Sequence, residues 1–182
     1  ANGVLILAEV AGGKVIPVTF ELIGAAQRLD AGPVSAMLIG SGVEGAAAQI
    51  TGVEKVYVID DAALAQYTND GYTQAAAAIA KRVDPAVILL GQTSAGRDLG
   101  PSLAYSLGTA VAMDTVALEM KDGKLHGTRP AYGGNARAVN GFTTSPAIAT
   151  VRPKSQDAAA GGAAPAVEKV AFDASGIRAK VT

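Results

Sequence analysis

The sequence predicts an α/β domain in which a parallel sheet is followed by antiparallel strands, and three observations point to this fold class. Up to about residue 108, short apolar runs alternate with alanine-rich helical patterns, as in βα units that feed a parallel sheet. Beyond that point the expected strands follow one another without helices between them. The chain has 182 residues, which fits one domain of roughly 100 to 200 residues.

The first half of the chain supplies four expected strands, each a short apolar run. Continuous runs such as GVLILAEV at residues 3–10 are typical of strands that are covered on both faces. Thr19 is the expected cap of a first helix, which ends before Gly32 and Pro33 because a helix cannot continue there. The remaining strands are expected at residues 34–39, 55–59 and 86–90, and the later helices at about 42–50, at 62–83 with an interruption at 69–71, and at 97–107.

The second half predicts a hairpin and further strands. Asp122 and Gly123 stand between two apolar runs, which indicates a tight turn between a strand at 111–120 and one that starts at Lys124. Two more strands are expected at 135–142 and 147–151. Residues 1–153 form the expected domain body, residues 154–166 an expected Ala-, Gly- and Pro-rich linker, and residues 167–182 a segment with a last strand at 167–172. Because no terminating signal precedes Thr182, we expect the natural chain to continue.

The composition excludes several kinds of site. The chain has no cysteine, which removes disulfides, thiolate metal sites and cysteine nucleophiles together. Its one histidine, His126, makes a multi-histidine metal site improbable and is expected to be a solvated strand residue. Fifteen basic and sixteen acidic side chains give a net charge of -1, which offers nucleic acid no attracting field. Without an 18-residue apolar stretch or a signal peptide, we expect no membrane insertion and a cytoplasmic location.

The first candidate binding loop is Gly40-Ser41-Gly42-Val43-Glu44-Gly45, which matches G-x-G-x-x-G between an expected strand and an expected helix. Asp60 and Asp61 follow about twenty residues later, where a carboxylate would bind ribose hydroxyls in a dinucleotide site. The motif follows the second strand rather than the first, and Glu44 brings a negative charge to the supposed phosphates. A nicotinamide-dependent oxidoreductase and an ordinary glycine-rich turn are therefore both open interpretations.

The second candidate loop joins the fourth expected strand to its helix. Its candidate nucleotide contacts are Gly91, Thr93, Ser94, Gly96, Arg97 and Asp98, which offer hydroxyls, glycines and helix N–H groups to an anion. No lysine follows the glycine, so the loop is not a phosphate-binding loop of the Walker type. A cation at a helix start is unfavourable, so we expect Arg97 to be compensated by Asp98, by a neighbouring loop or by a bound phosphate. A small adenine-nucleotide sensor that uses this loop is a further alternative.

Three strings of sequence resemble the N-terminal domain of the electron transfer flavoprotein alpha subunit. They are PAVILLGQTSAGRDLGPSLAYSLG at residues 85–108, TRPAYGGN at 128–135 and ATVRP at 149–153, in that order and spacing. The opening VLILAE at 4–9, followed by Gly13 and Lys14, is similar too. The resemblance covers nearly the whole chain through Pro153.

This resemblance implies a Rossmann-like three-layer domain of the adenine nucleotide alpha hydrolase-like class, paired with a homologous beta subunit. In that family FAD carries electrons from dehydrogenases to a membrane quinone oxidoreductase or a similar acceptor. The family's C-terminal domain, which binds most of the FAD, would begin near Thr182, so we expect this chain to hold no cofactor tightly. In the family's beta subunit the counterpart of the GQTSAG loop meets AMP phosphates, whereas the alpha N-terminal domain is mainly a scaffold. The resemblance thus implies a scaffold without catalytic residues, in which residues 91–98 are a weak or vestigial nucleotide pocket.

Overall fold

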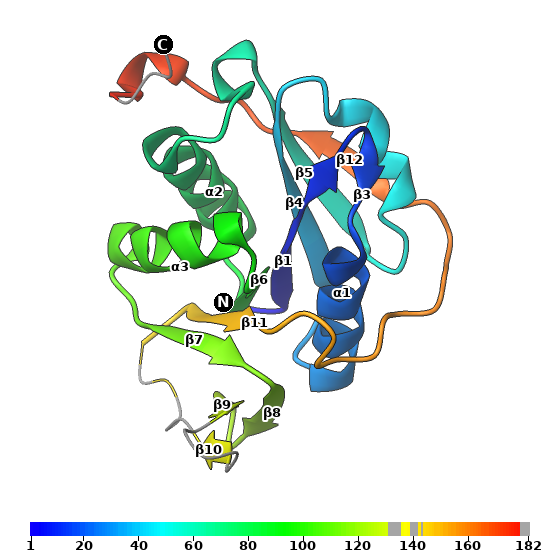
Figure 1. Cartoon of the computed structure of the whole chain (residues 1–182), viewed down its shortest axis with the longest axis vertical. Coiled ribbons are helices and arrows are strands. Elements are labelled where there is room, and N and C mark those ends of the chain that lie inside the picture. The colour runs from blue at the N-terminus through cyan, green and yellow to red at the C-terminus, as the bar shows by residue number, and fades with distance from the viewer. Residues whose placement is uncertain (131–135, 139–141, 143, 179–182) are drawn as a thin grey trace.

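A computed structural model of the chain describes residues 1–130, 136–138, 142 and 144–178. Its centre is a seven-stranded sheet in the order β12-β5-β4-β1-β6-β11-β7, and every pair of neighbouring strands in it is parallel (Figure 1). The expected parallel sheet is therefore confirmed. Its strands are β1 (Val4–Ala8), β4 (Val34–Gly40), β5 (Lys55–Asp60), β6 (Val87–Gly91), β7 (Val111–Thr115), β11 (Ala147–Val151) and β12 (Ala166–Lys169).

Helices cover both faces of this sheet, which gives three layers (Figure 1). Side chains alternate along a strand, so Val4 and Ile6 of β1 enter the core beneath α1 (Pro17–Leu29), while Leu5 and Leu7 enter the core beneath the other two helices. Those helices are α2 (Asn69–Val83) and α3 (Ser94–Leu107). This double covering explains the continuous apolar strands, which need no polar face.

A small antiparallel sheet follows the carboxyl end of β7. It contains β8 (Ala117–Lys121), β9 (Lys124–Pro130) and β10 (Ala136–Ala138), and the turn at Asp122 and Gly123 closes β8 onto β9 as the sequence predicts. The single strand expected at 111–120 is instead two, β7 and β8. The expected strand at 147–151 is present, but it does not pair with the antiparallel strands. It lies between β6 and β7 and is parallel to both. A short two-stranded ribbon, β2 (Val10–Ala11) and β3 (Lys14–Val15), leads into α1.

Four helix predictions need correction. Helix α1 begins at Pro17, so Thr19 lies in its first turn and does not cap it; its hydroxyl accepts a hydrogen bond from the Glu9 backbone N–H instead. The segment expected as a helix at 42–50 forms a 3₁₀ turn, η1 (Glu44–Gln49). The break expected at 69–71 comes earlier, between the 3₁₀ turn η2 (Ala62–Leu64) and α2. Helix α3 starts at Ser94, three residues before the expected start.

The segment after β11 runs across α1 to the far edge of the sheet, where β12 pairs with β5 (Figure 1). The Ala159 N–H donates to the Phe20 carbonyl of α1, and the Arg28 guanidinium donates to the Asp157 carbonyl. Gly24 makes this close approach possible, because a Cβ there would lie 2.3 Å from the Asp157 carbonyl oxygen. The residues expected as a surface linker are therefore hydrogen-bonded to the domain body.

The last described element is the 3₁₀ turn η3 (Ala174–Gly176). Two sequence features fall outside the described residues: the YGGN end of the TRPAYGGN string and the chain end at residues 180–182. Most of the strand expected at 135–142 also lies outside them, apart from β10. Within the described part of the chain, none of the helices is both long and apolar enough to cross a membrane.

Candidate functional site

The strand order places both glycine-rich loops at one edge of the sheet. The chain passes from β1 through β4 to β5 on one side, and then crosses to β6 on the other side of β1. In open parallel sheets, ligands bind outside the carboxyl ends of the strands at such a reversal. The loop after β4 begins at Gly40 and the loop after β6 begins at Gly91, so this edge is the candidate site.

The loop after β4 is closed by a carboxylate of the chain itself. The backbone N–H groups of Gly42 and Glu44 donate to the two carboxylate oxygens of Asp60, at 2.8 and 3.0 Å. These hydrogen bonds, above all the one from Glu44, hold the pKa of Asp60 below its usual value. In a dinucleotide site the loop N–H groups face pyrophosphate and the later carboxylate faces ribose. Here the carboxylate takes the place of the phosphate, and the 3₁₀ turn that follows provides no long helix dipole.

The loop after β6 has the geometry of a capped helix start. The Thr93 side chain is the N-cap of α3 and accepts a hydrogen bond from the Gly96 N–H at 3.1 Å. Gly96 lies against the end of β6, where an added Cβ would be 1.8 Å from the Gly91 carbonyl oxygen. A Cβ added at Gly91 would lie 3.0 Å from a methyl carbon of Val18 in α1. Packing against the end of β6 thus requires glycine at position 96, whereas a Cβ at position 91 would make a tight contact with α1.

Glu9 lines the candidate site, although the sequence did not indicate it as a site residue. It follows β1, and its carboxylate accepts the hydrogen bond of the Thr93 hydroxyl, which lies 2.9 and 3.0 Å from the two oxygens. Burial raises the pKa of Glu9, and the bond from Thr93 opposes that rise in part. A negative group therefore stands at the start of α3, where a helix dipole favours an anion. The available signal was an acidic residue at the end of an otherwise apolar strand.

The two charged residues of the second loop do not pair with each other. The Asp98 carboxylate accepts hydrogen bonds from the Tyr67 hydroxyl at 2.6 Å and the Asn69 amide at 3.0 Å, and the bond from Tyr67 is the main cause of its lowered pKa. Arg97 is the fourth residue of α3, at the end of its first turn, and is exposed, as is Ser94. The Arg97 backbone N–H donates to the Thr93 carbonyl, but among the residues that the structure describes its guanidinium has no hydrogen bond or ion pair, so neither Asp98 nor a neighbouring described loop compensates its charge.

A pocket of about 370 Å³ lies between the two loops. It is lined by the end of β1 with Glu9, by residues 40–43 after β4, by Tyr67 and Tyr72, and by Ala95 and Leu99 of α3. The rings of Tyr67 and Tyr72 are tilted against each other with centroids 4.8 Å apart. The six predicted contact residues of the second loop do not line this pocket. One of them, Thr93, donates a hydrogen bond to Glu9, which does line it.

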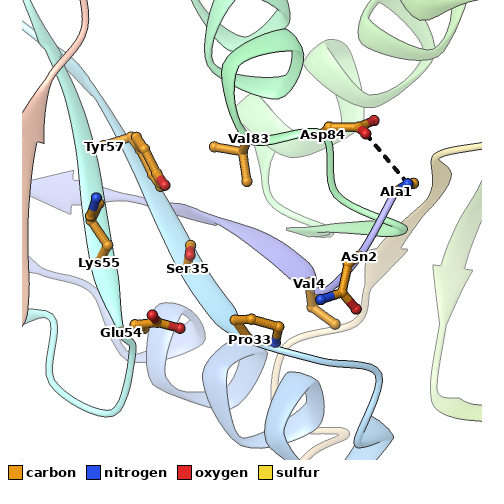
Figure 2. Close-up of a pocket in the computed structure, with 10 residues that line it drawn as sticks. All are labelled: Ala1, Asn2, Val4, Pro33, Ser35, Glu54, Lys55, Tyr57, Val83 and Asp84. Carbon is orange, nitrogen blue, oxygen red and sulfur yellow. Dashed lines mark ion pairs between the residues drawn. The ribbon is translucent and has the colours of Figure 1, made fainter.

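A second pocket of about 360 Å³ lies at the opposite edge, at the amino ends of β1, β4 and β5 (Figure 2). Most of its charged groups are already paired, Asp84 with the amino group of Ala1 at 3.3 Å and Lys55 with Glu168 at 3.3 Å, whereas Glu54 lines the pocket without an ion pair among the described residues. Because ligands of parallel sheets bind at the carboxyl ends, this pocket is the less suitable candidate. No group of three or more potential metal ligands occurs within the described ranges.

Comparison with known families agrees with the fold and with the sequence strings. The model of the electron transfer flavoprotein domain matches residues 4–175. The chain belongs to this family. The resemblance found in the sequence is therefore confirmed, and nearly all of the described strands and helices fall within the electron transfer flavoprotein domain.

Relatives within the family carry the names of alpha subunits or of related subunits. The electron transfer flavoprotein subunit alpha of Thermoanaerobacterium thermosaccharolyticum is 39% identical over 155 residues, which are 81% of this chain and 47% of the relative. The subunit alpha of Megasphaera elsdenii is 38% identical over 160 residues, 84% of this chain and 47% of the relative. Subunit LctC of the lactate dehydrogenase (NAD(+),ferredoxin) of Acetobacterium woodii is 36% identical over 160 residues, 84% of this chain and 38% of the relative. The chain spans about half the length, or less, of these curated relatives.

Proposed function

We propose that this chain is the N-terminal scaffold domain of an electron transfer flavoprotein alpha subunit. In this role it pairs with a beta subunit and supports electron transfer from dehydrogenases, through FAD held elsewhere, to a downstream acceptor. It is then part of an electron carrier rather than an enzyme, because flavin performs the redox chemistry while protein side chains supply binding and electrostatics. We further propose a bacterial cytoplasmic location, which the bacterial sources of the relatives favour.

The observation that carries this proposal is the closure of both glycine-rich loops by internal carboxylates. Asp60 accepts the N–H groups of the first loop, and Glu9 accepts the Thr93 hydroxyl at the start of α3. A loop in use for phosphate binding keeps such donors available for its ligand. The contacts favour a domain whose loops hold its own elements together, with residues 91–98 a vestigial nucleotide pocket.

The residues at this edge do not fit the pyrophosphate of FAD. A bound pyrophosphate needs N–H donors and positive charge, whereas the first loop's N–H groups already donate to the Asp60 carboxylate and the second loop's Thr93 hydroxyl donates to the Glu9 carboxylate. The tight FAD site therefore belongs, in our proposal, to a part of the alpha subunit outside this sequence. The match to about half of each relative's length is consistent with such a division of labour.

The alternative, a nicotinamide-dependent enzyme that uses residues 40–45 and Asp60, makes the opposite prediction for one variant. If Asp60 bound ribose, Asp60→Ala would abolish NADH binding. If Asp60 instead closes the loop, the same variant frees the N–H groups of Gly42 and Glu44, and binding of NADH or inorganic pyrophosphate stays weak or increases. Micromolar binding of NADH to the unaltered chain, lost in Asp60→Ala, would establish the enzyme instead of the scaffold.

The scaffold role is tested by co-expression of this chain with the beta subunit from the same genome, with an affinity tag on one partner. The expected result is a complex of equal stoichiometry whose flavin absorbance is absent or far below one FAD per chain. A chain that binds stoichiometric flavin alone, or a longer natural chain that forms no heterodimer, would overturn the proposal.

A further inference from the structure

The pocket between the two loops differs in chemistry from the loops themselves. Its walls combine apolar side chains, among them Leu7, Ile39 and Leu64, with a nearly equal share of polar surface, and its volume of about 370 Å³ is within the range of small-molecule sites. It lies at the strand-order reversal, where parallel sheets bind ligands. The proposed scaffold role does not use this pocket.

One charged side chain lines the pocket, and it is negative. Glu9 is fixed there by two contacts, since its backbone N–H donates to Thr19 and its carboxylate accepts from Thr93. In the neighbouring loop, the N–H groups of Gly42 and Glu44 are already bound to the Asp60 carboxylate. A phosphate that entered the pocket would meet like charge in a partly buried setting, where screening is weak.

The same carboxylate suits a neutral ligand with hydrogen-bond donors. An ionised carboxylate offers about four acceptor sites, and Thr93 occupies only part of this capacity. The tilted rings of Tyr67 and Tyr72 form an aromatic part of the wall, against which a flat ring packs favourably. The Tyr67 hydroxyl is directed to Asp98, so the ring rather than the hydroxyl is the group available to a ligand.

We propose that this pocket binds an uncharged, ring-containing compound of nucleoside size with hydroxyl or amino donors, and that Glu9 selects against the phosphorylated form. The pocket would thus accept a nucleoside and reject the corresponding nucleotide. This inference goes beyond the scaffold function, since it concerns a ligand that neither flavin binding nor subunit pairing requires.

The test titrates the chain with adenosine and with AMP at neutral pH and equal ionic strength, followed by backbone amide NMR shifts. We expect adenosine to bind with a dissociation constant below about 1 mM and AMP to bind about tenfold or more weakly. The shifts should be largest around Val10, Gly42 and Ala95, which line the pocket. Equal or tighter binding of AMP, absence of adenosine binding, or shifts centred elsewhere would each overturn the proposal.

Two variants make the role of Glu9 specific. Glu9→Gln keeps an oxygen acceptor for Thr93 and removes the charge, so the preference for adenosine over AMP should fall about fivefold or more. Glu119→Gln removes a carboxylate from the exposed strand β8 and should leave the preference unchanged. An unchanged preference in Glu9→Gln would show that Glu9 does not select. Subunit pairing and flavin content, measured on the same preparation, report separately on the scaffold function.

Discussion

The glycine at position 96 gives the sharpest test of whether the GQTSAG loop is built for packing or for a ligand. A Cβ at Gly96 would lie 1.8 Å from the Gly91 carbonyl oxygen, whereas real Cβ contacts essentially never fall under 3.0 Å. Gly96→Ala must therefore move the start of α3 away from β6 by about 1.2 Å, the difference between these two distances. The Gly91 oxygen is a backbone atom and the position of a Cβ at residue 96 is fixed by the backbone, so relief by side-chain rotation is not available.

The size of the effect follows from two opposing terms. Overpacking of a tight interior costs about 1–3 kcal/mol, and a backbone contact this short belongs at the upper end of that range. Alanine in a helix is favoured over glycine by about 1 kcal/mol, which offsets part of the strain. We expect the free energy of unfolding to fall by about 2 kcal/mol, and the melting temperature to fall by about 4–8 °C for a domain of this size.

The assay is urea unfolding followed by circular dichroism, with thermal melting as a second measurement. Gly45→Ala is the matched control, because an added Cβ there meets nothing within 4 Å and the residue lies in the 3₁₀ turn after the other glycine loop. We expect this control to be neutral or slightly stabilised, by up to about 1 kcal/mol. A Gly96→Ala protein as stable as the control would refute the packing argument. It would favour a ligand-binding role for this glycine instead.

The remaining predictions concern the charged groups around the site. Glu9 has a raised pKa in the folded chain, so its ionisation begins to cost stability as the pH rises above the ordinary glutamate pKa, and the cost is complete above the raised pKa; Glu9→Gln should stabilise the chain at pH 7, with the gain disappearing on acidification below the ordinary glutamate range. Asp60 has a lowered pKa, so its contribution is present above the ordinary aspartate range and lost below it; Asp60→Asn should destabilise at pH 7 and not at pH 2–3, and urea titrations across pH check both signs. Tyr67→Phe should raise the pKa of Asp98, measured by carboxyl NMR titration, and cost about 1 kcal/mol; an unmoved pKa would contradict the 2.6 Å contact. Glu168→Gln removes the partner of Lys55 and Arg82 and should speed amide exchange in β12 while costing at most about 1 kcal/mol, less at high salt; unchanged exchange would mean that pairing with β5 alone holds the strand.

Local chemistry in the sequence accounts for much of the fold. The turn at Asp122 and Gly123 was predictable because left-handed backbone favours these residues, and both have positive φ in the structure, 53° and 74°. The strand positions of the first half were predictable because buried parallel strands are continuously apolar. The true N-cap of α3 is Thr93, whose hydroxyl accepts a hydrogen bond from the Gly96 N–H. The expected start was three residues late because a threonine three residues before a glycine is not a strong local signal of a helix start.

Features that depend on distant residues were not predictable in the same way. The position of β11 between β6 and β7 depends on hydrogen bonds to strands about 60 and 35 residues earlier in the chain, and no local pattern records this. Glu9 and Thr93 are 84 positions apart, so only the folded sheet brings the carboxylate to the start of α3. The hydrogen bonds of Asp60 to Gly42 and Glu44 were not predictable for a related reason: the motif gives the spacing between loop and carboxylate but not which group the loop N–H groups face.

The last strand has a consequence for how the chain is made. Strand β5 is complete once residue 60 has been synthesised, but its outer hydrogen-bonding edge is covered only by β12, more than a hundred residues later. Throughout that interval a nascent chain exposes a row of open N–H and C=O groups, which is a template for pairing between neighbouring chains. Translation to about residue 170 therefore marks the moment at which newly made molecules become protected from self-association.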